Sequence, residues 1–353
     1  MFPDTSSSSS SSSSDEEQEM CLRRPKIYRR REQHFSSLDD IEFFDRFRLT
    51  KRSVLCLLQQ IASSLSFPSN RGGCIEPMQQ LLLTLRFYAT GNMLITAGDF
   101  IGVSKASASR IVQRVSQSIA LLRPKYIEMC EGDIEMQAEA EKFYKIARFP
   151  KTIGAIGCTL IKIKSPGGDD TETFRCRKDF FAMKVQTVSD SELRIRDIVA
   201  RWPGSAHNQT VFDNSNLKRK FQSGKFGPYL LVGDSSYTLE PYLMTKLVDA
   251  RTDSEKLYNE SIIKTRNVVE RKNGVWKHRF PILSSGIRVK LETTLAIIVA
   301  IGVLHNVALD MSDIFPEEWS SEIQEEEESL CQHISSSASQ ARQLIINEHF
   351  DDI

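Results

Sequence analysis

The sequence lacks the cysteine and histidine patterns of metal-stabilised and disulfide-stapled domains. Its seven Cys are scattered without a CxxC pair, and its six His form no HxxxH motif or Cys/His cluster. Zinc fingers and disulfide scaffolds are excluded, because both need closely spaced ligands or paired cysteines. Reduced thiols, and hence an intracellular protein, are the simplest interpretation.

Long apolar runs and a secretory leader are also missing. The longest apolar stretch, residues 295–304, is shorter than the ~20 residues that span a bilayer, and the N-terminus is a serine tract rather than an apolar signal region. The composition, 40% hydrophobic and 26% charged, excludes collagen-like, coiled-coil and wholly disordered chains. We expect roughly two or three globular domains with no membrane partner.

Net charge is zero over the whole chain but is unevenly distributed. Residues 1–20 hold five acids and no base, and residues 317–353 hold ten acids and one base. The 46 basic and 46 acidic residues of the chain therefore leave 45 basic against 31 acidic residues between them, a net charge of +14. A basic body with acidic ends favours a polyanionic partner, with nucleic acid as the leading candidate, although surplus Lys and Arg can also simply solvate a surface.

Composition divides the chain into four parts. Residues 1–36 form a serine-rich and basic arm that we expect to be disordered, with six bases in residues 23–31. That basic run fits a nuclear import signal, an arm on phosphates or an ordinary linker equally well. We expect a helical domain over 37–148, a domain of mixed strands and helices over 149–316, and an acidic tail with a short C-terminal helix over 317–353.

The helical part contains a helix-turn-helix-like segment. Residues 93–101, a glycine turn at Gly102 and a second helix capped by Ser104 have the required spacing. The second helix would present Ser104, Lys105 and Arg110, side chains that suit a major groove or its phosphates. Any helical hairpin with a glycine turn imitates this pattern, so DNA contact is a hypothesis here.

Beyond Pro150 the hydrophobic period changes to that of strands. The predicted strands are 152–164, 180–188, 193–200 and 229–234, and the predicted helices are 211–221, 257–280 and 291–309. The short turns between the first three strands make them antiparallel, and the apolar fourth strand fits a central position with both faces covered. This order predicts an α/β fold of ribonuclease-H-like type, a mixed sheet flanked by helices.

Two carboxylates are candidate catalytic residues. Asp234 ends the fourth predicted strand and Glu270 lies on the following long helix. Phosphodiester hydrolysis commonly uses two divalent metals held by carboxylates from separate elements, which these two residues could supply. Asp234 is equally explained as a turn residue at the end of a strand, and Glu270 as an ion-pair partner of Arg266 or Arg271.

Several motifs resemble those of a known family. They are GAIGC at 154–158, KIKSP at 162–166, WPGS at 202–205, GDSSY at 233–237, VER at 269–271 and VLHN at 303–306. In order and spacing they resemble PIF/Harbinger transposases, and among these the domesticated, transposase-derived nucleases. The resemblance covers about residues 38 to 350. It implies a DDE-type endonuclease, a hydrolase that acts on DNA with Mg²⁺ or Mn²⁺. It also implies location in the nucleus and cytoplasm, and a Myb/SANT-like DNA-binding protein as partner.

Carried onto this chain, the family pattern makes Asp234 and Glu270 the second and third metal-binding carboxylates. The first does not carry over, because Gly157 stands where the family has Asp. Leu160 replaces a common His, and Asn208 replaces a common Asp.

Glycine has no side-chain oxygen, so a site without this carboxylate loses a metal ligand and a negative charge. Three hypotheses follow. The chain is a metal-dependent endonuclease in which His207 or Asn208 completes the site. Alternatively, it is a catalytically inactive DNA- or partner-binding protein. In the third, it is a helix-turn-helix regulator whose C-terminal domain mediates assembly.

Overall fold

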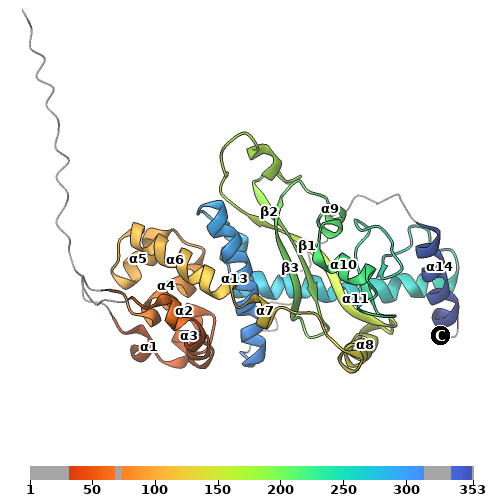
Figure 1. The fold of residues 1–353 in the computed structure, drawn as a ribbon, viewed down its shortest axis with the longest axis horizontal. Coiled ribbons are helices and arrows are strands. Elements are labelled where there is room, and N and C mark those ends of the chain that lie inside the picture. The colour runs from red at the N-terminus through yellow and green to blue at the C-terminus, as the bar shows by residue number, and fades with distance from the viewer. Residues whose placement is uncertain (1–31, 68–73, 314–334, 352–353) are drawn as a thin grey trace, which may run out of the picture.

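The computed structural model describes residues 32–67, 74–313 and 335–351 as a group of helices joined to a five-stranded sheet (Figure 1). The serine tract, the basic run at 23–31 and the acidic run at 317–328 lie outside the described residues. The expected disorder up to residue 36 is corrected at its end. There α1 (His34–Ser37) is helical, and the buried His34 ring stacks on Phe100 with 4.0 Å between centroids.

The helices before the sheet follow the apolar spacing of the sequence. They are α2 (Asp40–Phe47), α3 (Lys51–Leu65), α4 (Pro77–Thr90), α5 (Leu94–Ile101), α6 (Lys105–Ala120), α7 (Arg123–Tyr126) and α8 (Asp133–Ala147). Asp39, Thr50 and Ser104 accept hydrogen bonds from first-turn backbone amides, so α2, α3 and α6 begin at capping residues. The predicted helical N-terminal region is confirmed.

The sheet has the strand order β3-β2-β1-β4-β5. Its strands are β1 (Thr152–Lys162), β2 (Ala182–Ser189), β3 (Ile195–Pro203), β4 (Leu230–Val232) and β5 (Leu243–Met244). β1, β2 and β3 pair antiparallel, whereas β4 and β5 run parallel to β1. The predicted mixed sheet of ribonuclease-H-like type is confirmed, with the two-residue β5 added at its edge.

Between β3 and β4 the structure has two helices instead of the single helix predicted over 211–221. α9 (Asn208–Asp213) ends at Asn214, and α10 (Asn216–Gln222) begins at a new cap, where the Ser215 side chain accepts a hydrogen bond from the Lys218 amide. A capping serine provides a local reason for the break, because it offers the backbone an alternative to continuing the first helix. Between β1 and β2, the short 3₁₀ helix η1 (Thr171–Phe174) lies in the long connection that rises above the sheet in Figure 1.

Helices cover both faces of the sheet. The long α11 (Asp253–Arg279) begins with a capping box of Thr252 and Glu255 and crosses the sheet in Figure 1. Together with α8 it packs against the face of Ala155, through Phe143, Val268 and Val269. Helices α9 and α10 pack against the opposite face, which carries Ile156. The elements that complete the chain are α12 (Ile282–Ser285), α13 (Leu291–Asp310), α14 (Ser336–Ile345) and η3 (Ile346–Phe350).

One apolar core runs from the helical region into the sheet. Helix α13 packs against α6 and β3, and buried residues of α3, α4, α6, α13, β1 and β3 belong to one cluster. By length and composition α13 could cross a membrane, but 72% of its apolar window is buried inside the protein. That burial is what a central core helix needs, and it explains why the sequence is apolar there on all sides.

Candidate active site

Gly157 lies within β1 and faces α11. It pairs directly with Thr187 of β2, and a Cβ added at Gly157 would lie 3.1 Å from Cγ1 of Val269. Gly157 therefore lies on the sheet face that packs against α11, the helix that carries Glu270. The resemblance places the first carboxylate of the family at this position. In this chain no side chain from position 157 fills the space.

Lys272 of α11 lies beside that position. Its side chain is fully buried, and Nζ donates hydrogen bonds to Thr187 Oγ1 at 2.5 Å and to Asn273 Oδ1 at 2.6 Å. Directly opposed residues on antiparallel strands have Cβ atoms about 4.5 to 5.5 Å apart. Thr187 is directly opposite Gly157, so the Lys272 amine is bonded to the residue that a carboxylate at 157 would face across the strand pair.

Burial determines the electrostatics of this lysine. Desolvation lowers the pKa of Lys272 from its ordinary 10.5 to about 7, and the negative charge of Glu270 opposes that shift. Sequence reasoning missed Lys272, although a signal was present. Val268, Val269, Val275 and Trp276 form the buried stripe of α11 around it, so a lysine at that spacing was marked for burial.

Asp234 follows β4 and is buried. Its Oδ1 accepts hydrogen bonds from the Ser236 amide at 2.9 Å and from the Ser236 hydroxyl, which is the turn role weighed for it as an alternative. Asn208 Nδ2 lies 3.5 Å from the other oxygen, Oδ2, so the structure brings Asn208 and Asp234 together. Asn208 Oδ1 in turn accepts from Lys184 Nζ at 2.9 Å, while His207, the N-cap of α9, is exposed.

Glu270 has a different environment. It forms an ion pair with Arg266 one turn earlier, with 3.0 Å between Arg266 Nη2 and Glu270 Oε1, as the alternative interpretation proposed. It lines a cavity whose lining residues do not include Asp234. Cys158 lies between the environments of Glu270 and Asp234. It lines the cavity beside Glu270, and its Sγ lies 3.3 Å from the hydroxyl of Tyr237, a residue of the turn that follows Asp234.

These residues do not fit a pair of divalent cations. Within 32–67, 74–313 and 335–351, no three His, Cys, Asp or Glu side chains are grouped so that they could hold a metal ion. Basic groups lie close to where anionic ligands are needed: Lys272 bonds Thr187, opposite Gly157, and Arg266 is paired with Glu270. The metal-binding roles of Asp234, Glu270, Asn208 and His207 stay predictions.

The helix-turn-helix-like segment has the geometry that its sequence indicates. Gly102 ends α5 in the left-handed conformation at φ 74°, and the Ser104 hydroxyl caps α6. A Cβ at Gly98 would lie 2.7 Å from the Val103 carbonyl oxygen, so the glycine allows the turn after α5 to pass close to that helix. Ser104, Lys105 and Arg110 are exposed, as a DNA-contacting role would require.

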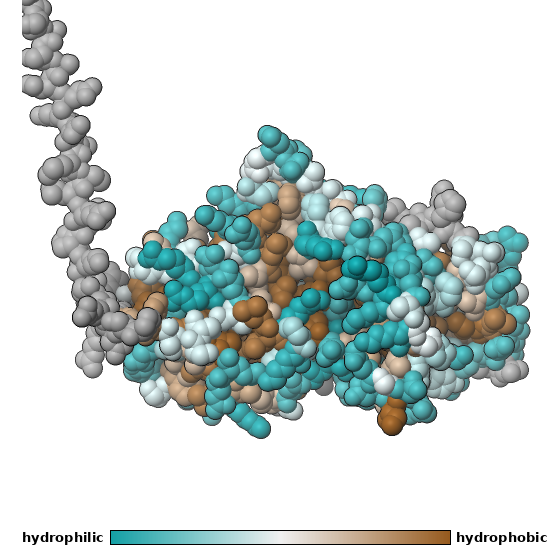
Figure 2. Space-filling model, in the orientation of Figure 1, coloured by the Kyte–Doolittle hydropathy of each residue, from teal (hydrophilic) through white to brown (hydrophobic). Residues whose placement is uncertain are grey.

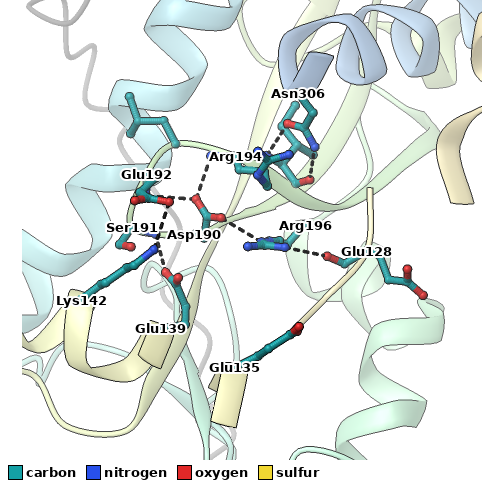
Figure 3. A network of polar contacts seen from close by, with 12 residues as sticks. Glu128, Glu135, Glu139, Lys142, Asp190, Ser191, Glu192, Arg194, Arg196 and Asn306 are labelled. Atoms are coloured by element: carbon teal, nitrogen blue, oxygen red, sulfur yellow. Dashed lines mark hydrogen bonds and ion pairs between the residues drawn. The ribbon is translucent and has the colours of Figure 1, made fainter. Parts of the chain in front are cut away.

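The VLHN motif has a structural explanation. Asn306 of α13, labelled in Figure 3, is fully buried. It accepts from the Ile195 amide at 2.9 Å and donates to the carbonyl oxygens of Ile195 and Tyr126. His305 Nε2 donates to the Leu193 carbonyl at 2.8 Å, and burial lowers the pKa of this ring to about 3, so it stays neutral. The motif thus fastens α13 to β3.

Two carboxylates beside the turn that joins β2 to β3, Asp190 and Glu139, are also explained by packing. Figure 3 shows Asp190 in the turn after β2, where it accepts from the Arg194 amide and forms a 2.8 Å ion pair with Arg196. Burial raises the pKa of Asp190, and Arg196 opposes that shift. Glu139 of α8 accepts from the Ser191 amide, so these carboxylates fasten α8 to the hairpin.

Replacing Asn306 by Ala is expected to lower the free energy of unfolding by about 3 to 5 kcal/mol, because it leaves two buried backbone groups and one part-buried carbonyl without their partner. Urea denaturation of this variant, compared with the exposed Asn347→Ala, would measure the loss. Equal and small changes in both variants would show that the motif does not fasten α13.

The chain has relatives among known proteins. The family described as DDE superfamily endonuclease matches residues 156–306. The protein named "Putative nuclease HARBI1" in Xenopus laevis is 30% identical over 302 residues, covering 83% of this chain and 86% of that protein. Its Homo sapiens namesake is 28% identical over 323 residues, covering 89% and 92%. "Protein ALP1-like" of Arabidopsis thaliana is 24% identical over 301 residues, covering 78% and 73%. No solved structure matches the chain.

Proposed function

Because the chain belongs to the PIF/Harbinger family of transposase-derived DDE endonucleases, we propose that it is a nuclease-like protein that binds DNA and no longer hydrolyses it. The observation that carries the proposal is the site around Gly157. A carboxylate is missing from β1, and the buried amine of Lys272 lies beside the vacant position. When that amine is protonated it repels the metal ions that the family's hydrolysis requires, so two features oppose the same chemistry.

Charge supports the binding half of the proposal. Residues 21–316 carry a net charge of +14, enough to attract a phosphate backbone without any sequence recognition. In Figure 2 hydrophilic residues cover most of the visible surface over α9 and α10, and apolar residues show between the helical region and the sheet. The exposed first turn of α6, with Lys105 and Arg110 nearby, is the proposed point of groove or phosphate contact.

The decisive experiment measures binding and cleavage on the same preparation. Fluorescence anisotropy with a short duplex should show binding that weakens as salt rises, and incubation with Mg²⁺ or Mn²⁺ should leave the duplex intact. Cleavage that disappears in Asp234→Ala would overturn the loss of hydrolysis and restore the endonuclease hypothesis. A folded protein that binds no DNA would overturn the binding half.

Replacing Lys105 and Arg110 by Ala is expected to weaken duplex binding and to reduce the slope of log affinity against log salt by about two, one for each cation removed. Both side chains are exposed, so folding should be unaffected. The measurement is the same anisotropy titration at several salt concentrations. An unchanged slope would place the DNA elsewhere on the basic body and remove the helix-turn-helix interpretation.

The regulator hypothesis is tested by substitutions in α6 and not by deleting the C-terminal domain. Helix α13 and the α3 to α6 helices share one apolar core, so removing residues 150–316 would expose that core. The substitutions in α6 leave the core intact and therefore test the hypothesis directly. A Myb/SANT-like partner and location in nucleus and cytoplasm remain proposals that follow from the family.

A further inference from the structure

A basic cavity of about 620 Å³ opens beside Glu270, among β1, the connection after η1 and the last turns of α11. Its basic lining residues are Lys162, Lys178, Lys277 and His278. Its one acidic lining residue, Glu270, is ion-paired with Arg266. The cavity is therefore positively charged, although it lies next to a position that the family uses for cations.

The cavity also has an aromatic wall. Phe180 is half-buried in the lining, and Nζ of Lys162 lies 5.7 Å from the centre of its ring. Leu160, Pro281 and Leu283 contribute further apolar surface. An aromatic ring with lysines around it is the combination that proteins use for unpaired nucleotides, since the ring stacks on a base and the ammonium groups hold the phosphates.

Size distinguishes an unpaired nucleotide from a duplex. Sites for small molecules have volumes of about 300 to 1,000 Å³, and this cavity falls within that range. A duplex is contacted instead by elements that enter its grooves, and a major groove about 12 Å wide admits a whole helix. The cavity has room for one base with its sugar and phosphate.

We propose that this cavity binds an unpaired nucleotide of a DNA strand, with the base against Phe180 and the phosphate held by Lys162 and Lys277. The proposal rests on the proposed function, because it assumes that the chain binds DNA. It adds a second DNA contact, far along the chain from Lys105 and Arg110 and specific for single strands.

The test compares two probes, an oligothymidylate and a blunt duplex, by fluorescence anisotropy with the full-length protein. Phe180→Ala should weaken oligothymidylate binding by about fivefold or more, the low end of the effect of losing one base–aromatic stack, and should leave duplex affinity unchanged. Phe180→Tyr keeps the ring and should restore binding. Lys277→Gln should also weaken oligothymidylate binding, whereas Lys264→Gln, an exposed lysine on the same helix outside the cavity, should not.

The outcomes separate this inference from the proposed function. Wild type that binds duplex but not oligothymidylate overturns the cavity proposal alone. The same holds if Phe180→Ala and Lys277→Gln bind oligothymidylate as wild type does. Wild type that binds neither probe overturns the proposed function. Because Phe180 is half-buried, circular dichroism should confirm the fold of its variants, and the Lys277 pair decides the question if Phe180→Ala does not fold.

Discussion

Gly157→Asp alone is expected to create no Mn²⁺ site, whereas Gly157→Asp combined with Lys272→Thr is expected to bind Mn²⁺ with measurable heat. An Asp at 157 would lie beside Thr187, whose hydroxyl is 2.5 Å from Lys272 Nζ. The new carboxylate would therefore pair with the buried ammonium, and a paired carboxylate is a poor ligand for a second cation. Removing the amine frees the carboxylate to act with Glu270.

Isothermal calorimetry with Mn²⁺ on wild type, both single variants and the double variant measures this coupling. The added Cβ lies 3.1 Å from Val269 Cγ1, so Val269 must shift by a few tenths of an ångström, and thermal melts should verify the fold. Binding by the Gly157→Asp single variant would show that Lys272 does not occupy the site. Binding by Lys272→Thr alone would show that the missing carboxylate is not the defect.

The fold was largely predictable because its elements have strong local signals. Alternating or wholly apolar runs marked the four longer strands, and the stripe of valines marked α11. The two-residue β5 has no such signal, since Leu243 and Met244 become a strand only by pairing with β4. The break between α9 and α10 depends on a single capping serine, Ser215, in a segment that is otherwise helical in pattern.

The candidate site was predictable in part. The sequence placed Asp234 near Asn208 and allowed an Arg266 to Glu270 pair, and the structure has both contacts. The missing Asp at 157 was visible from the resemblance. What lies near it was not, because the Lys272 amine bonds Thr187, opposite Gly157, through the packing of α11 on β2, a contact between residues 85 positions apart in the chain. The missing ligand could therefore be predicted from the sequence, whereas the charge near it could be known only from the tertiary structure.

Wild-type stability is expected to rise by roughly 3 kcal/mol between pH 7 and pH 9.5, relative to Lys272→Met. Burial lowers the pKa of Lys272 to about 7, whereas in the unfolded chain it is near 10.5. Between these values the unfolded state binds one more proton than the folded state, so stability rises with pH at about 1.4 kcal/mol per unit. Below pH 7 both states are protonated and the slope disappears.

Urea denaturation at several pH values, with the difference between wild type and Lys272→Met plotted against pH, isolates this group because the other titrations cancel. Met has a similar length and no charge, so the variant should be the more stable protein near pH 7 and lose that advantage as pH rises. Lys264→Met, on the exposed face of the same helix, should give a flat difference. A flat difference for Lys272→Met as well would mean that the amine keeps its proton when buried. The site beside Gly157 would then hold a permanent positive charge, and the barrier to metal binding would not weaken in alkali.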